Sequence, residues 1–257
     1  MDEIPSIGII VTAEQIPLLR DVIVTHHLDV FICDTQDTQL LDDHWKPWLR
    51  RVRPQRTHCT GEVWLIVPTY AWPRPDSHAR IRQIIAEQLH TCIQMAVILN
   101  ATGIVIPIEH AQADFHERIH HYLTVVHSQL TMHSLKLMLL IESPAHVAEV
   151  QTFITTYALE CTLLLPSDHH IDADTTDNSV GHKTLIAITS DDQAYIVPEL
   201  TKGCVLGAHD SVSVIRKKLQ SVVQQFAQRD MIEHDADTDA DTVPPEQLFS
   251  TPDDEVA

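Results

Sequence analysis

Short apolar runs recur along the chain and alternate with longer amphipathic or irregular segments. The runs are rich in Val, Ile and Leu and are apolar at nearly every position, as strands buried on both faces are. This pattern predicts parallel strands joined by crossover connections, many of them helical. Eight runs have this character: residues 7–11, 29–33, 63–67, 104–108, 135–141, 161–165, 184–188 and 203–207.

Several segments between these runs carry apolar residues at helical spacing. The stretch from 111 to 130 places Phe115, Ile119 and Val126 on one face of a predicted helix. Helices are also predicted for residues 77–100 and, as the last element, for residues 212–228. The stretch from 35 to 61 contains two tryptophans and several arginines and is predicted to be irregular.

Eight strand units over about 230 residues predict an α/β fold, a (β/α)8 barrel of parallel strands, with an open doubly wound sheet as the alternative. The barrel domain is expected to span residues 1–229. Ten acidic residues and no Lys or Arg lie between 230 and 257, which also contain Pro244-Pro245. This acidic segment is predicted to be disordered, either as a tail or as the start of a linker.

Composition narrows the classes of function. The formal net charge of −19 opposes binding to a phosphate backbone, so no nucleic-acid partner is expected. No apolar run approaches the roughly 20 residues of a membrane span, so no membrane partner is expected either. Five scattered cysteines without a Cys-x-x-Cys pair are typical of reduced thiols in a cytosolic or nuclear protein.

The segment from Trp64 to Ser77 carries a resemblance. A strand-like run that begins with Trp64 leads to Trp72 and then to Arg74-Pro75-Asp76-Ser77; a long helix and Pro107-Ile108 follow. In this block the chain resembles the N-terminal TIM-barrel domain of type 5 protein arginine methyltransferases, which form symmetric dimethylarginine. Weaker similarity extends from about Ile7 to Phe226.

The resemblance implies a non-catalytic barrel domain that assists oligomer assembly and docks a WD-repeat partner or substrate adaptors. In that family the methyl-transfer domain follows the barrel and holds S-adenosylmethionine. Residues 1–257 contain no Gly-x-Gly loop of that kind, so no cofactor and no catalytic residue is expected in this chain. The chain would then be a fragment or a stand-alone relative of the enzyme.

The resemblance also implies a partner-binding segment, because the family contacts its WD-repeat partner through the loop after the second strand. Aromatic and arginine side chains are typical of the residues that dominate binding energy at protein interfaces. The alternative is that both tryptophans pack onto their own barrel. The partner-binding residues predicted here are Trp45, Trp48, Arg50, Arg51 and Arg53.

The block that carries the resemblance also has a structural interpretation. Asp76 or Ser77 can accept hydrogen bonds from the first N–H groups of the following helix, and Pro75 fixes the entry of the chain. We therefore expect structural roles for the family-motif residues Trp64, Trp72, Arg74, Pro75, Asp76 and Ser77.

His116-Glu117-Arg118-Ile119-His120 matches the H-E-x-x-H pattern of zinc proteases. On a helix, His116 and His120 share one face and can bind one metal ion, with Glu117 as the general base. The apolar face of this segment is centred elsewhere, so solvent-facing histidines are the alternative. This motif is kept as a second enzymatic hypothesis.

Acidic residues also follow several of the predicted strands, at the end of a barrel where active sites lie. Glu109 and Glu142 form a candidate carboxylate pair for acid–base catalysis in a TIM-barrel hydrolase. The alternative is that these acids cap the following helices. The acidic residues in question are Asp34, Glu109, Glu142, Asp191 and Asp210.

Overall fold

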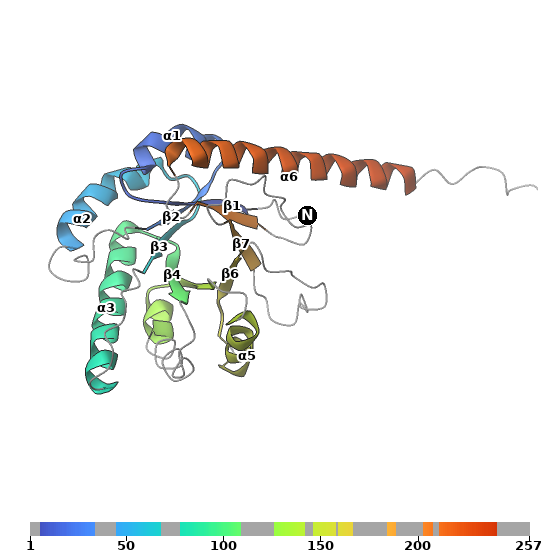
Figure 1. The fold of residues 1–257 in the computed structure, drawn as a ribbon. Helices are drawn as coiled ribbons and strands as arrows, with labels where there is room; N and C mark the ends of the chain where they lie inside the picture. The colour runs from blue at the N-terminus through green and yellow to red at the C-terminus, as the bar shows by residue number, and fades with distance from the viewer. Residues whose placement is uncertain are drawn as a thin grey trace, which may run out of the picture.

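A closed barrel of eight parallel strands in sequential order forms the centre of the protein, with β1 paired to β8 (Figure 1). The computed structural model describes residues 6–33, 45–67, 78–108, 126–141, 146–157, 159–166, 184–188, 203–207 and 211–240. The predicted (β/α)8 barrel is confirmed, and the open sheet is excluded. The elements are β1 (Ser6–Val11), α1 (Ile16–Thr25), β2 (Asp29–Ile32), α2 (Trp45–Val52), η1 (Arg53–His58), β3 (Val63–Ile66), α3 (His78–Leu99), β4 (Gly103–Ile108), β5 (Lys136–Ile141), α5 (Val147–Tyr157), β6 (Thr162–Pro166), β7 (Thr184–Ile188), β8 (Gly203–Leu206) and α6 (Val212–Ala240).

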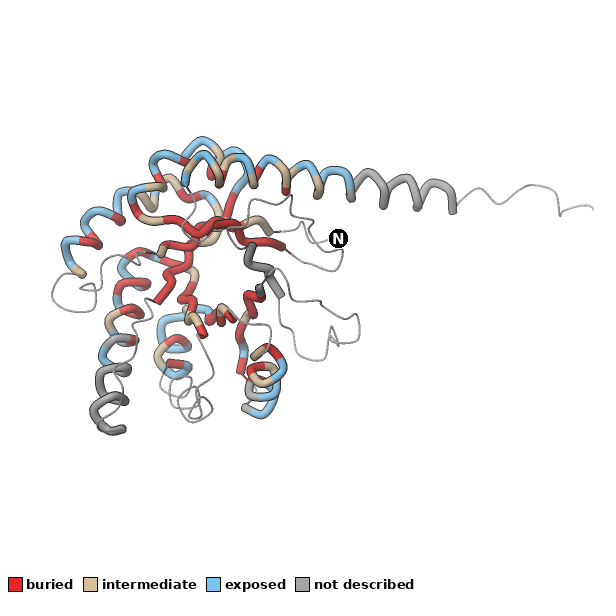
Figure 2. Tube along the Cα trace, viewed as in Figure 1, coloured by how far each residue is buried: buried red, intermediate tan, exposed pale blue. Residues whose placement is uncertain are grey.

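Beyond their first residues the strands are almost entirely apolar, because they are buried on both faces. Outward-facing side chains such as Ile9, Ile104 and Leu163 pack beneath the surrounding helices, whose buried sides face the barrel (Figure 2). Inward-facing side chains form a separate apolar cluster that fills the barrel, as expected for a packed core rather than a pore. That inner cluster consists of Ile10, Phe31, Trp64, Ile66, Val105, Met138, Leu164 and Val205.

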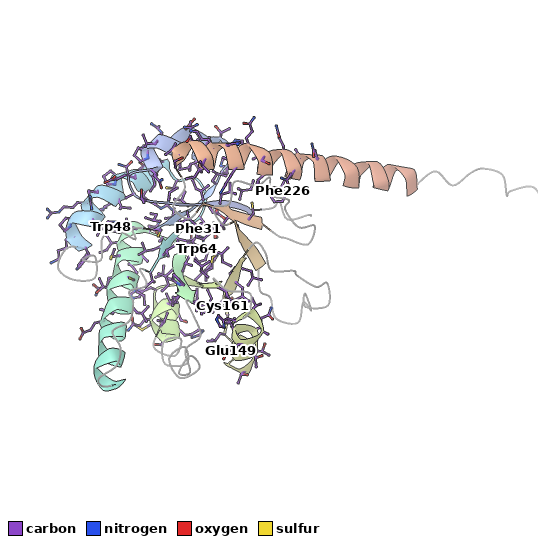
Figure 3. The ribbon with its side chains drawn as sticks, in the orientation of Figure 1. Phe31, Trp48, Trp64, Glu149, Cys161 and Phe226 are labelled. Atoms are coloured by element: carbon purple, nitrogen blue, oxygen red, sulfur yellow. The ribbon has the colours of Figure 1, made fainter. Side chains whose placement is uncertain are left out.

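Two aromatic rings dominate the inside of the barrel. Phe31 and Trp64 occupy paired positions on β2 and β3 and stack with their ring centroids 6.1 Å apart (Figure 3). The volume for these rings comes from glycines on the flanking strands: Gly8 adjoins the Phe31 ring, and Gly103 adjoins the Trp64 ring. Glycine in a strand interior therefore marks the close approach of a neighbouring group here.

Three helices end in the same way before the next strand begins. A residue with positive φ follows each helix: His27 after α1, Asn100 after α3 and Ser134 after the helical residues 126–132. The residue after it donates its N–H to a carbonyl five positions back, the bond of a Schellman motif. These bonds are Leu28 to Ile23, Ala101 to Ala96 and Leu135 to Leu130. The repeated cap turns the chain back toward the barrel with its helix-end carbonyl satisfied.

Helix α6, which follows the last strand, is hydrogen-bonded to the first helix, α1. Arg216 donates two hydrogen bonds of 2.7 Å to the carboxylate of Asp21 on α1, and these bonds lower the pKa of Asp21 below its usual 3.8. The helix continues to Ala240, beyond the predicted end at residue 228 and into the segment predicted to be disordered. No Gly or Pro occurs between 208 and 240, so nothing in the chain stops the helix earlier.

Two further predictions from the sequence concern the cysteines and membrane-spanning segments. All five cysteines are free, and four of them are buried. Burial raises the pKa of the Cys92, Cys161 and Cys204 thiols to about 12, so these groups stay protonated near neutral pH. Within the described residues, no helix is long and apolar enough to span a bilayer.

Candidate functional site

The carboxyl end of the strands is the end of a barrel at which chemistry takes place. The inward-facing side chains nearest this end are apolar on three strands: Cys33 directly after β2, Ile66 on β3 and Leu140 on β5. They form a hydrophobic floor beneath the loops that follow the strands. On these three strands, a polar group acting at this end must come from residues beyond the strand ends.

The register of β4 and β5 carries the argument for paired carboxylates. The two strands pair over six consecutive positions, and the last pair is Ile108 with Ile141. Glu109 and Glu142 are the residues that directly follow this pair in the sequence. Neighbouring strands lie about 4.8 Å apart, so Ile108 and Ile141 end the two strands side by side and at the same level. Glu109 and Glu142, like Asp34, Asp191 and Asp210, lie outside the described residues.

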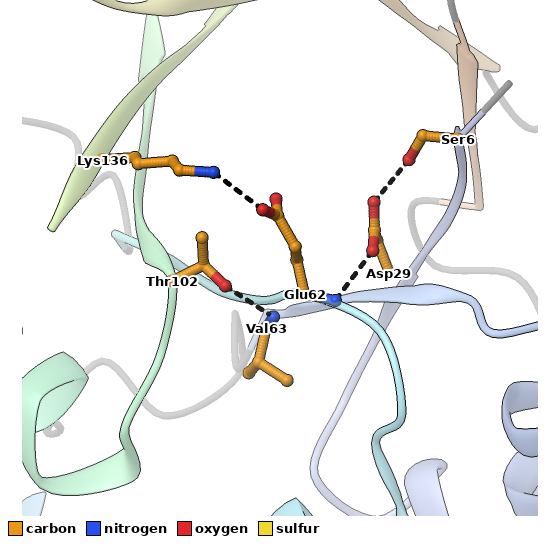
Figure 4. Close-up of polar contacts among 6 residues, drawn as sticks. All are labelled: Ser6, Asp29, Glu62, Val63, Thr102 and Lys136. Carbon is orange, nitrogen blue, oxygen red and sulfur yellow. Dashed lines mark hydrogen bonds and ion pairs between the residues drawn. The ribbon is translucent and has the colours of Figure 1, made fainter. Parts of the chain in front are cut away.

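The opposite end of the barrel carries a continuous chain of polar contacts (Figure 4). Ser6 donates a 2.5 Å hydrogen bond to Asp29, and the backbone N–H of Glu62 donates to the other carboxylate oxygen of Asp29 at 2.8 Å. The Glu62 side chain in turn accepts a 2.8 Å bond from the ammonium group of Lys136. Both acids are thus bonded, so this cluster joins β1, β2, β3 and β5 at the amino end of the barrel.

This amino-end cluster is absent from the sequence predictions. Its members are the first residues of their strands or lie directly before one, where a polar residue precedes an apolar run. They are also separated by 23 to 74 positions in the chain. Only the strand register brings them together. Because the amino end of a barrel usually serves stability, we assign the cluster a structural role.

The stretch predicted to be irregular contains a helix. Residues 45–52 form α2, and residues 53–58 form the 3-10 helix η1. Trp48, Leu49 and Val52 are buried beneath α2, and Trp48 is only 1% exposed (Figure 3). The side chain of Trp48 is therefore core and not surface, which corrects its assignment to a partner-binding site.

The remaining residues of the predicted partner-binding segment divide by exposure. Trp45 is half-buried and packs against the core. Arg50, Arg51 and Arg53 are exposed, and Arg51 lies 4.0 Å from the carboxylate of Glu14. The partner-binding prediction is therefore limited to the outward side of α2 and the first residue of η1.

Of the other sequence motifs, part lies within the described residues and part lies outside them. Trp64 lies inside the barrel and is 3% exposed, in keeping with its predicted structural role. Trp72, the Arg74–Ser77 block and the zinc motif His116–His120 lie outside the described residues. In the part of the chain that the structure describes, no three His, Cys, Asp or Glu side chains gather as a metal site.

The fold of the chain is similar to that of several solved structures. Neither a scan of protein-family models nor a search of curated proteins gives a match. The TTHB071 protein of Thermus thermophilus, soaked with ZnCl2, matches with a TM-score of 0.59 at 13% identity, over 87% of this chain and 98% of that one. D-allulose 3-epimerase from Methylomonas sp. matches with a TM-score of 0.56 at 10% identity, over 88% and 100%.

A third structure, 3-keto-D-glucoside 4-epimerase YcjR from E. coli, matches with a TM-score of 0.54 at 12% identity, over 84% of this chain and 98% of that one. Identities this low establish the fold alone. They lend no support to the expected relationship with arginine methyltransferases. The chain is thus a TIM barrel, similar in fold to these three structures, two of which are sugar epimerases.

Proposed function

We propose that the chain is a TIM-barrel enzyme that transfers protons on a small carbohydrate, with Glu109 and Glu142 as its acid–base pair. The observation that supports the proposal is the paired register of Ile108 and Ile141, directly before the two glutamates. The solved structures with this fold include two sugar epimerases, which suggests the substrate class. This proposal develops the carboxylate hypothesis drawn from the sequence.

The chemistry requires the two carboxyl groups to hold different protonation states. Two like charges close together oppose ionisation of both, so one carboxyl keeps its proton while the other stays ionised. The ionised carboxylate removes a proton from the carbon next to the substrate carbonyl, and the protonated one donates a proton to the resulting anion. One proton leaves the substrate and one returns, so the atoms and charge balance.

The apolar floor assists this division of roles. Cys33, Ile66 and Leu140 bring little polar surface to the barrel end. A carboxyl group near such a surface is poorly solvated in its charged form, which raises its pKa and favours a general acid at neutral pH. The same pair also satisfies the requirement of glycoside hydrolysis for two carboxyl groups, which is the hydrolase form of the hypothesis.

Incubation of the protein in D2O with a panel of aldoses and ketoses tests the proposal. We expect deuterium to enter at the carbon next to the carbonyl, observed by proton NMR as loss of that signal. Glu109→Gln and Glu142→Gln should each slow this exchange by roughly 10²–10⁴-fold, because each removes a proton-transfer group.

Glu160→Gln is the matched control, because Glu160 is exposed and lies before β6 at the amino end of the barrel. This variant should exchange deuterium at the wild-type rate. No incorporation with any sugar by the wild-type protein, or equal rates in the two site variants and the wild type, would refute the proposal.

A second candidate function rests on the outward side of α2. Arg50, Arg51 and Arg53 are exposed in a chain of net charge −19, so their basic surface stands out. This surface supports the alternative that the chain is the barrel domain of an arginine methyltransferase, docking a WD-repeat partner there. The substrate adaptors and subunit assembly expected from the resemblance belong to the same proposal.

Capture of a purified WD-repeat partner tests this second candidate. Wild-type protein should retain the partner, and Arg50→Ala/Arg53→Ala should reduce capture at least tenfold, because arginines often dominate interface energy. Trp48→Ala is unsuitable as a probe because that side chain is core. Arg20→Ala, on α1, is the control and should leave capture unchanged. Absence of wild-type capture would eliminate this candidate.

A further inference from the structure

A stripe of basic side chains follows the outward face of α2 into η1. Lys46, Arg50 and Arg53 are four and three positions apart, which places them on one side of a helical segment. All three are exposed, whereas Trp48, Leu49 and Val52 on the opposite side are buried. We call Lys46, Arg50 and Arg53 the basic stripe.

The basic stripe has no acidic residue within α2 or η1; Asp42 and Asp43, shortly before α2, lie outside the described residues. No Asp or Glu occurs between residues 45 and 61. Among the described residues, no carboxylate pairs with any of the three side chains; Arg51, on the same helix, lies 4.0 Å from the carboxylate of Glu14. Lys46 instead lies over the Trp45 ring, 5.6 Å from its centroid. The stripe therefore presents positive charge to solvent from a protein that is strongly negative overall.

The chain itself contains a segment of complementary charge. Residues 230–257 hold ten acidic residues and no Lys or Arg. Acidic and basic side chains in separate surfaces attract, and several weak pairs add up when they lie along one segment. We infer that the basic stripe of α2 binds the acidic C-terminal segment of a second copy of this chain.

The direction of α6 favours binding of residues 230–257 to the basic stripe of a second copy and not to the stripe of the same molecule. The helix begins beside α1 and extends away from α2 (Figure 1). Its 29 residues span about 44 Å at 1.5 Å per residue. The 17 residues from 241 to 257 reach about 58 Å when fully extended. A return to α2 of the same molecule would use most of that length, whereas a neighbouring molecule can be reached without it.

Such a contact joins two different surfaces, so it links copies head to tail. It does not depend on either proposal for function given above, and it assigns Arg50 and Arg53 to a different partner from the one in the second proposal. The attraction acts between exposed charges, which salt screens over about 10 Å at 0.1 M ionic strength. Self-association is therefore expected at low salt and is expected to disappear at high salt.

Sedimentation velocity of the full chain tests the inference. We expect concentration-dependent association at about 20 mM salt and monomers at about 500 mM salt, because salt screens the exposed charges. Arg50→Glu/Arg53→Glu should weaken the low-salt association at least tenfold. The control Arg20→Glu/Lys217→Glu alters two exposed bases on α1 and α6 with the same change in net charge, and it should associate as the wild type does.

A mixing experiment separates this contact from general charge effects. Asp235→Lys/Asp237→Lys should also fail to associate alone, because its own segment no longer matches its intact stripe. Mixed with Arg50→Glu/Arg53→Glu, it should form a mixed dimer, since each variant supplies the surface that the other lacks. Monomeric wild type at low salt, equal loss in the control pair, or no mixed dimer would each overturn the inference.

Discussion

Gly103→Ala is expected to prevent the barrel from folding stably. A Cβ atom at this position would lie 2.1 Å from the backbone oxygen of Lys136 on β5 and 2.7 Å from the Trp64 ring. The backbone oxygen cannot move without opening the β4–β5 pairing, so a small local shift cannot relieve the steric overlap. We expect the free energy of unfolding, measured in urea, to fall by more than about 3 kcal/mol.

Gly8→Ala provides the contrast that makes this prediction specific. The Cβ atom there would lie 2.5 Å from Cε2 of Phe31, an atom of a side chain and not of the backbone. Phe31→Leu removes that atom, so the double variant Gly8→Ala/Phe31→Leu should be more stable than the sum of the two single changes by about 1–2 kcal/mol.

The corresponding double variant at the other glycine should show no such recovery. Trp64→Leu removes the ring beside Gly103 but leaves the contact with the Lys136 backbone oxygen. Gly103→Ala/Trp64→Leu is therefore expected to remain as unstable as the two changes combined. A Gly103→Ala protein with the wild-type urea midpoint would show that the two strands do not approach as the structure places them.

Much of the fold follows from the sequence because the strands are buried on both faces. Continuous apolar runs locate each strand to within one residue at either end; the run 184–188, for example, coincides with β7. The closing pair of β1 with β8 joins residues about 200 positions apart, so no local pattern reveals it. The number of strand units and the size of the chain indicate closure instead.

The helix α2 could have been predicted from residues already in view. Trp45, Trp48, Leu49 and Val52 follow one another at intervals of three, one and three positions, which is the spacing of one helical face. Pro47 lies in the first turn, where a missing N–H is tolerated, so it does not break the helix. The density of tryptophan and arginine suggested an interface. Trp48 is buried in the core, however, and Trp45 packs against it.

The sequence identifies the acidic residues of the candidate site, and the strand register shows which strands they follow. Glu109 and Glu142 can be named from the sequence as acids at strand ends. That β4 and β5 are neighbours with Ile108 opposite Ile141, directly before these two acids, is something only the folded chain shows. The amino-end cluster around Asp29 depends entirely on such long-range pairing, so its residues appear in the sequence as unrelated polar positions.

Closure of the ring is the central claim, because it brings all eight strand ends to one site, and a single disulfide tests it. Ile7 on β1 pairs with Cys204 on β8. Paired residues on adjacent strands are about 5 Å apart, within the 4.4–6.8 Å range of disulfide Cα atoms. Burial raises the pKa of Cys204 to about 12, so Ile7→Cys should be oxidised during refolding with glutathione and not in the native state.

Mass spectrometry of the trypsin digest then shows whether the disulfide between position 7 and Cys204 has formed. A closed barrel predicts that Ile7→Cys yields residues 1–20 linked to residues 203–216. Ile9→Cys is the matched control, since Ile9 pairs with Leu206 and is about 8 Å from Cys204, too far for a bridge. The linked peptide from Ile7→Cys alone is the predicted result; its absence, or equal linkage from Ile9→Cys, would contradict the closed barrel.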